Sequence, residues 1–169
     1  MKFSLFIFLC FFVISISSGI EGTFGNKFQW RTLEEGFAMV KSDEKPGILV
    51  IHKTWCTSSQ YFGKRFARDM QIKNLAKDFV FISCLDDDEP EDPKYSPDGK
   101  YYPRIFFINP NGEVNYEINN SGYSPQHKYY YFDTKHLVDN MEIMIKSVKH
   151  YKNQWTIPVP PNSHEEDEL

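Results

Sequence analysis

The 169-residue sequence is poor in cysteine and, after its first residues, has no long apolar run. Of its three cysteines, Cys10 lies in the apolar N-terminal segment, which leaves Cys56 and Cys84. Two cysteines are too few for a small fold stapled by disulfides. The histidines have no zinc-type spacing, so no metal site is expected. The net charge of −4 gives no reason to expect a nucleic-acid partner.

The N-terminal segment has the pattern of a secretory signal peptide. Lys2 precedes an apolar stretch from Leu5 to Ile16, and small residues up to Gly19 follow as a cleavage site. An uncleaved anchor is the alternative, but the stretch is shorter than the roughly 20 residues that span a bilayer. We therefore expect residues 1–19 to be removed, leaving no segment for a membrane.

The last four residues resemble a retention address. Glu166, Asp167, Glu168 and Leu169 differ from the KDEL signal only at the first position, and such a tail is read by a receptor. A solvated acidic tail is the alternative. Together with a signal peptide, the tail predicts residence in the lumen of the endoplasmic reticulum, with a retention-signal receptor as a partner.

Hydrophobic periodicity predicts one α/β domain over residues 32–152, between a loose N-terminal arm (20–31) and a flexible tail (153–169). Thr32 and Glu35 form a capping box that opens the first helix. Strands are expected over 48–52, 79–84, 104–108 and 113–118. Helices are expected over 33–41 and from 134 to about 149. A further helix is expected after Cys56, with a bend or break at Gly63 or Asp69. A strand–helix–strand unit followed by a hairpin and a helix is the arrangement of the thioredoxin fold, a mixed sheet flanked by helices.

The stretch TWCTSSQ, Thr54 to Gln60, lies where the first core strand passes into a helix. A redox protein would carry Cys-x-x-Cys here, but Ser59 replaces the second cysteine. The backbone N–H groups and dipole of a helix N-terminus favour a thiolate, so Cys56 is the candidate nucleophile. An inert buried cysteine is the alternative. Trp55 and Thr57 flank Cys56 as candidate substrate-binding residues, and Lys53 is expected to add positive potential.

Pro103 directly precedes the strand over 104–108. In a thioredoxin fold this proline is cis and faces the reactive cysteine, and the backbone before it, at Tyr102, pairs with an extended substrate. A trans proline at a strand start is equally compatible with the sequence.

Val50 stands where dithiol enzymes carry a buried carboxylate that serves the second cysteine. The absence of this carboxylate agrees with the absence of the second cysteine at Ser59.

Three further features each allow two interpretations. Cys84 ends a predicted strand, either as a small core residue or as a resolving partner for Cys56. The acidic residues between 86 and 92 form a solvated loop or a weak Ca²⁺ site without EF-hand spacing. Asn119 begins an N-glycosylation sequon on a predicted loop, Asn119-Asn120-Ser121, which is used or left unmodified.

The stretches WRTLEEG, IHKTWC, SPDGKYYPRIFFINPNGEV, KYYYF and the terminal EDEL resemble the anterior gradient family of endoplasmic-reticulum thioredoxin-fold proteins. The resemblance implies thiol–disulfide chemistry on cysteine-containing secretory clients, without a bound cofactor and with glutathione as a co-substrate. One family member carries Cys-x-x-Cys, and the others carry Cys-x-x-Ser as here. Family dimers use a Glu-x-x-x-Lys contact, but Met39 follows Glu35 at the Lys position, so a monomer is expected.

Two functions are compatible with these features. The first is a monothiol enzyme for thiol–disulfide exchange or isomerisation, in which a second thiol from outside the chain completes the cycle. The second is a non-catalytic chaperone or retention factor that holds secretory clients beside Pro103.

Overall fold

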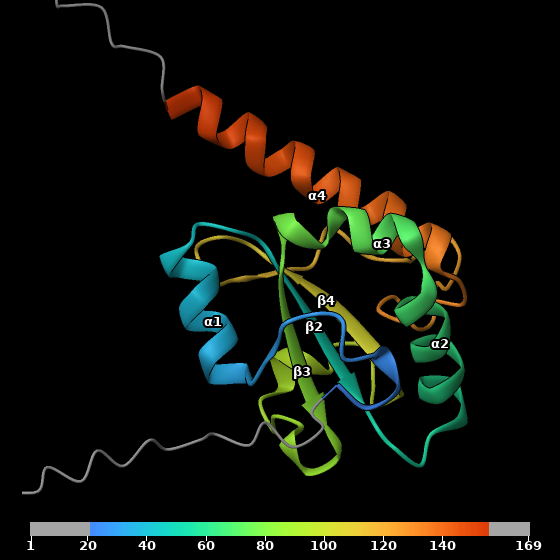
Figure 1. The fold of residues 1–169 in the computed structure, drawn as a ribbon. Coiled ribbons are helices and arrows are strands. Elements are labelled where there is room, and N and C mark those ends of the chain that lie inside the picture. The colour runs from blue at the N-terminus through green and yellow to red at the C-terminus, as the bar shows by residue number, and fades with distance from the viewer. Residues whose placement is uncertain (1–20, 156–169) are drawn as a thin grey trace, which may run out of the picture.

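A five-stranded mixed sheet forms the centre of the molecule (Figure 1). The computed structural model describes residues 21–155, so the expected signal peptide and retention address lie outside the described residues. The strand order is β1 (Trp30–Arg31), β3 (Val80–Leu85), β2 (Gly47–His52), β4 (Arg104–Ile108) and β5 (Val114–Asn115). β3 pairs in parallel with β1 and β2, whereas β4 pairs antiparallel with β2 and β5.

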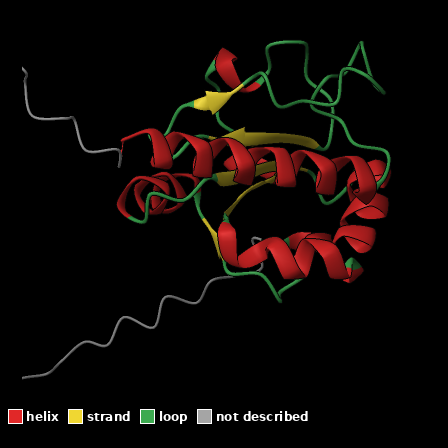
Figure 2. Cartoon of the chain, turned by 90° about the horizontal axis from the view of Figure 1, so that it is seen from above, coloured by secondary structure: helices red, strands yellow, loops and turns green. Residues whose placement is uncertain are grey.

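Helices cover both faces of this sheet. In Figure 1, α1 (Leu33–Ser42) lies on one side of the strands, and α2 (Thr57–Arg68) and α3 (Met70–Leu75) lie on the other. The long helix α4 (Thr134–Trp155) passes over the strands in the view of Figure 2. This arrangement confirms the predicted thioredoxin fold. Within the described part of the chain, no helix combines the length and the apolar character needed to cross a membrane.

The central strands are buried on both faces. In β2, Ile48 and Val50 pack in the layer beneath α2 and α4, while Leu49 and Ile51 pack beneath α1. Successive side chains of a strand point to opposite faces, so a strand covered on both sides is apolar throughout. This explains why β2, β3 and β4 appear in the sequence as short continuous apolar runs.

Local capping signals place the helix ends. α1 begins with the predicted capping box, in which the Thr32 hydroxyl accepts from the backbone N–H of Glu35 and the Glu35 side chain accepts from that of Thr32. Asp69 separates α2 from α3, because its carboxylate accepts from the N–H groups of Gln71 and Ile72. These contacts confirm the capping box and identify Asp69 as the break.

Gly63 does not interrupt α2; it allows the N-terminal arm to approach the helix. A Cβ atom at Gly63 would lie 3.0 Å from the backbone carbonyl carbon of Thr23. Thr23 belongs to the short 3-10 helix η1 (Gly22–Phe24), and its hydroxyl donates to the carbonyl oxygen of Ser59. The arm therefore packs directly on the helix that follows Cys56.

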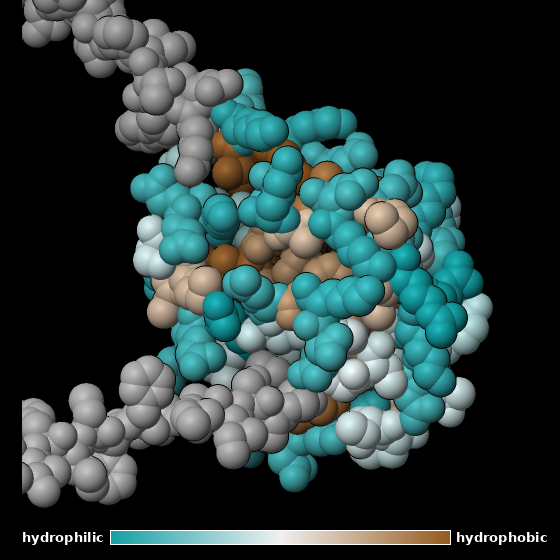
Figure 3. Space-filling model, viewed as in Figure 1, coloured by the Kyte–Doolittle hydropathy of each residue, from teal (hydrophilic) through white to brown (hydrophobic). Residues whose placement is uncertain are grey.

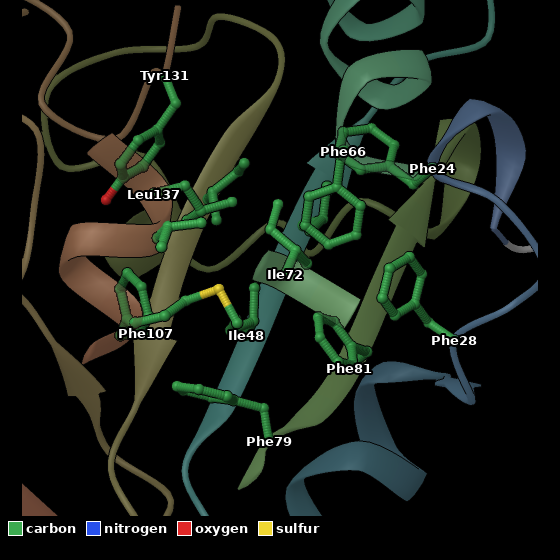
Figure 4. Close-up of a cluster of buried hydrophobic side chains, with 14 of the residues drawn as sticks. Phe24, Phe28, Ile48, Phe66, Ile72, Phe79, Phe81, Phe107, Tyr131 and Leu137 are labelled. Atoms are coloured by element: carbon green, nitrogen blue, oxygen red, sulfur yellow. The ribbon is translucent and has the colours of Figure 1, made fainter. Parts of the chain in front are cut away.

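The N-terminal arm belongs to the core, contrary to the expectation that it is loose. Phe24 packs against Phe66 with ring centroids 5.3 Å apart, and Phe28 packs against Phe81 at 5.0 Å (Figure 4). The arm also contributes strand β1 at the sheet edge. Its apolar residues are too irregularly spaced to show strand or helix periodicity, which is why the sequence did not predict this packing.

Two other boundaries differ from the sequence prediction. β5 ends at Asn115 rather than continuing to Ile118, because the Asn115 side chain accepts from the N–H groups of Glu117 and Ile118 and turns the chain. α4 continues to Trp155 instead of ending near Lys149, so residues 153–155, expected in the flexible tail, are helical. Asp133 caps the start of α4 as expected, through the N–H of His136.

Candidate functional site

Cys56 lies between the end of β2 and the start of α2. It is the N-cap of α2, and its carbonyl oxygen accepts from the N–H of Gln60 at 3.0 Å, which closes the first helical turn. Its side chain makes no capping hydrogen bond and is partly exposed. Instead, the Cys56 Sγ donates to the carbonyl oxygen of Tyr102 at 3.6 Å. The thiol is thus held beside the loop that precedes β4.

The Tyr102–Pro103 peptide bond is cis, and Pro103 is buried. Tyr102 also meets Trp55 in an edge-to-face contact with ring centroids 5.8 Å apart. Trp55 is 70% exposed, which makes it an open apolar surface next to the thiol. The fold thus brings together the two loops named as candidate sites from the sequence, while Thr57 is exposed at the first position of α2.

Ser59 lies in the first turn of α2 and is buried, with 1% of its surface exposed. Its carbonyl oxygen accepts from the Thr23 hydroxyl at 3.2 Å. Among the residues that the structure describes, its own Oγ has no hydrogen-bond partner. The Cys56 sulfur instead donates to the Tyr102 carbonyl oxygen. Ser59 therefore holds an unmatched hydroxyl donor in the first turn after Cys56.

Cys84 lies on β3 in the layer beneath α1, whereas α2 covers the opposite face of the sheet. Its side chain is fully buried, and both described cysteines are free thiols. Burial raises the pKa of Cys84 to about 12. These properties favour the core role over the resolving role.

The structure adds Glu89 to the site, which the sequence did not single out. The Glu89 Oε2 accepts from the Tyr102 hydroxyl at 2.6 Å and pairs with the Lys53 Nζ at 2.6 Å. Its Oε1 pairs with the guanidinium of Arg104, a side chain that is 1% exposed. Burial alone would raise the pKa of Glu89, but hydrogen bonds from Lys53, Tyr102 and Arg104 outweigh burial and lower the pKa to about 2.

Lys53 does not provide the uncompensated positive charge that was expected beside Cys56. Burial lowers the pKa of Lys53, but its contacts with Glu89 outweigh that effect and the net shift is upward. The Nζ also donates to the carbonyl oxygen of Asp86 at 2.5 Å. Glu89, which it shares with Arg104, therefore offsets part of the charge of this ammonium group.

The acidic loop over residues 86–92 is tied to the site rather than fully solvated. Besides Glu89, Asp86 accepts from the backbone N–H of Thr54 at 2.8 Å and from its hydroxyl at 2.9 Å. Within residues 21–155, no cluster of three or more His, Cys, Asp or Glu side chains could hold a metal ion. The sequence contained one signal of the ion pair between Glu89 and Arg104, because Arg104 is a charged residue inside an otherwise apolar strand.

Asn119, the glycosylation candidate, is partly buried. Its side-chain amide donates to the carbonyl oxygen of Tyr116 at 2.8 Å, and its Oδ1 accepts from the N–H of Ser121 at 2.8 Å. These bonds form a local turn around the sequon. Glycosylation of Asn119 stays a prediction.

A cavity of about 350 Å³ lies at the opposite end of the parallel strands from Cys56. Lys27, Phe28, Met39, Lys77 and Phe79 are among its lining residues. In the view of Figure 3, polar residues cover most of the surface, and apolar residues are visible in its middle. Cys56 is not part of this cavity.

The family model and the sequence relatives support the thioredoxin-like assignment made from the fold. Residues 29–110 match the family model described as thioredoxin-like. Human anterior gradient protein 2 homolog is 34% identical over 126 residues, covering 74% of this chain and 71% of the relative. Mouse anterior gradient protein 3 is 28% identical over 157 residues, covering 83% and 94%. A solved structure of DsbH oxidoreductase has a TM-score of 0.44 and 19% identity, covering 53% of this chain and 71% of that one.

The human relative matches about three quarters of this chain, and residues 29–110 match the thioredoxin-like family model. The chain therefore belongs to the anterior gradient family of thioredoxin-like proteins.

Proposed function

We propose that this protein is a monothiol thiol–disulfide exchange protein for secretory clients in the lumen of the endoplasmic reticulum. The observation that carries the proposal is the contrast between the two described cysteines. Cys56 is partly exposed at the N-terminus of α2, whereas Cys84 is fully buried in the layer beneath α1. One thiol is presented to partners, and Ser59 stands where a dithiol enzyme has its second.

The reaction begins when the Cys56 thiolate attacks a disulfide of a client or of glutathione. A sulfur–sulfur bond forms to Cys56, the original disulfide breaks, and the leaving thiolate takes a proton from solvent. Because Ser59 is not a thiol, release needs a second thiolate from the client or from glutathione. That thiolate attacks the client sulfur or glutathione sulfur bound to Cys56 and regenerates the Cys56 thiolate.

Ser59 contributes to this cycle through its unmatched hydroxyl. A thiolate cannot donate, so ionisation of Cys56 ends its hydrogen bond to the Tyr102 carbonyl oxygen. The thiolate sulfur then requires hydrogen-bond donors. The backbone N–H groups in the first turn of α2 supply some of them. The Ser59 hydroxyl supplies another, since it has no other partner among the described residues.

Client binding without turnover is the second candidate function. The specific observation in its favour is the 70% exposed Trp55 in contact with Tyr102, which provides an apolar surface for an unfolded chain. In this second function the protein holds clients beside Cys56, and its retention address returns the protein and the bound client to the endoplasmic reticulum.

A glutathionylated peptide distinguishes the two functions. Wild type should form a Cys56 adduct visible by mass spectrometry and should release free peptide repeatedly once reduced glutathione is added. Cys56→Ser should abolish both signals, whereas Cys84→Ser is the matched control and should retain them. Peptide binding that is unchanged in Cys56→Ser, with no adduct in wild type, would establish the non-catalytic alternative.

A further inference from the structure

The Glu89 carboxylate joins the acidic loop to three side chains around the thiol. Oε2 binds both the Tyr102 hydroxyl and the Lys53 ammonium, and Oε1 binds the Arg104 guanidinium. The exchange reaction itself makes no use of this carboxylate. A partly buried carboxylate with two cationic partners, of which Arg104 is fully buried, is costly to assemble, because each charge loses hydration on burial.

Tyr102 is held on several sides by this network. The Lys53 Nζ and the Arg104 Cζ lie 4.9 Å and 5.1 Å from the centre of its ring. Arg104 is fixed in turn, since it donates to the carbonyl oxygens of Tyr95 and Tyr101, both at 2.9 Å. Tyr102 therefore has two roles: its carbonyl oxygen accepts the hydrogen bond from the Cys56 thiol, and its side chain is held by the ionised Glu89 carboxylate from another loop.

We propose that Glu89 is a positioning residue for client capture: it holds Tyr102 so that the backbone beside Cys56 aligns the peptide around a client disulfide. The same carboxylate offsets part of the positive charge of Lys53 and Arg104, and so weakens their electrostatic effect on Cys56. This inference rests on the proposed exchange function. It predicts that Glu89 favours peptide disulfides over small disulfides, because only a peptide depends on the alignment of the Tyr102 backbone.

Removing the charge of Glu89 should have two opposite effects. Glu89→Gln keeps the shape of the side chain but loses two ion pairs, so Tyr102 is held less firmly and capture of a peptide disulfide slows. Lys53 and Arg104 then lose the negative charge that partly offset them, and the increased positive potential stabilises the Cys56 thiolate. Reaction with a small uncharged disulfide should accordingly become faster.

The experiment compares two probes by stopped-flow measurement of mixed-disulfide formation. One probe is a short unstructured peptide with a glutathionylated cysteine, and the other is 2-hydroxyethyl disulfide. The ratio of the peptide rate to the small-disulfide rate should fall by roughly tenfold in Glu89→Gln, the size expected from one lost charge-assisted hydrogen bond. Glu91→Gln removes the same charge from an exposed position on the same loop and should leave the ratio unchanged.

Tyr102→Phe provides a second arm that keeps the ion pairs of Glu89. It removes only the hydroxyl that donates to Glu89, and it should lower the same ratio. An unchanged ratio in Tyr102→Phe, or equal ratios in Glu89→Gln and Glu91→Gln, would overturn the positioning role. Failure of the proposed function looks different, because wild type would then form no Cys56 adduct with either probe.

Discussion

The thiol of Cys56 donates a hydrogen bond to the carbonyl oxygen of Tyr102, which lies 46 residues later in the chain and 3.6 Å away. The antiparallel pairing of β2 with β4 produces this contact, because Ile51 stands opposite Arg104 in the register. The loops that leave β2 and enter β4 therefore meet at the same edge of the sheet. One loop carries the nucleophile, and the other carries the backbone beside which a client peptide would lie.

Restoring the second cysteine should convert capture into release. In Ser59→Cys the new thiol lies one helical turn from Cys56, so it should form an internal disulfide and shorten the lifetime of client adducts. Insulin reduction, which should be negligible in wild type, should rise in this variant. It should still remain slow, because Val50 is buried in the core and offers no carboxylate to deprotonate the new thiol.

Ser58→Cys is the control for this variant, since neighbouring positions on a helix do not face the same way. It should not shorten the adduct lifetime. Equal insulin reduction by wild type and Ser59→Cys would contradict the resolution argument.

Cys84 should stay reduced and unreactive in the native protein. Its pKa of about 12 leaves almost no thiolate near neutral pH, and its side chain is fully buried. Alkylation followed by mass spectrometry should label Cys56 alone under native conditions and both cysteines after denaturation. A Cys56–Cys84 disulfide in the oxidised protein would show instead that the chain has its own resolving thiol.

Glu89 should make stability depend on pH in the acidic range. Its folded-state pKa of about 2 lies below its ordinary value of 4.5, so its stabilising contribution is complete above the unfolded-state pKa. That contribution is lost as the pH falls through the folded-state pKa. Urea unfolding should show wild type more stable than Glu89→Gln at pH 6, with the difference shrinking steadily towards pH 2.

Glu91→Gln is the reference for that titration, because Glu91 is exposed on the same loop. Its stability should follow wild type at every pH. A difference between wild type and Glu89→Gln that does not vary with pH would mean that the ion pairs with Lys53 and Arg104 contribute nothing through the charge of Glu89.

Retention in the cell should depend on the last four residues, Glu166 to Leu169. Deleting them should remove the proposed receptor-read address, so the protein should appear in the culture medium. Deleting residues 160–163 shortens the tail by the same number of residues but keeps the address, and should leave the protein inside the cell. Secretion that is equal for the two deletions would argue against a receptor-read signal.

The sequence by itself determined the features that depend on neighbouring residues. Apolar runs located the central strands, with β4 found at Arg104–Ile108, and the pair Thr32 and Glu35 located the start of α1. The position of Cys56 before a helix also followed from local pattern, and so did the absence of a second cysteine at Ser59. Periodicity and capping act within a few residues, so a single stretch of chain contains the whole signal.

Only the tertiary structure decided the features that join distant segments. Phe24 and Phe28 show no periodic pattern, and their place in the core depends on Phe66 and Phe81 being brought to them. Glu89 appears in the sequence as one acid among several on a polar loop. Its role arises because the fold excludes water around Arg104, and a buried cation requires a carboxylate partner whose position in the chain no local pattern specifies.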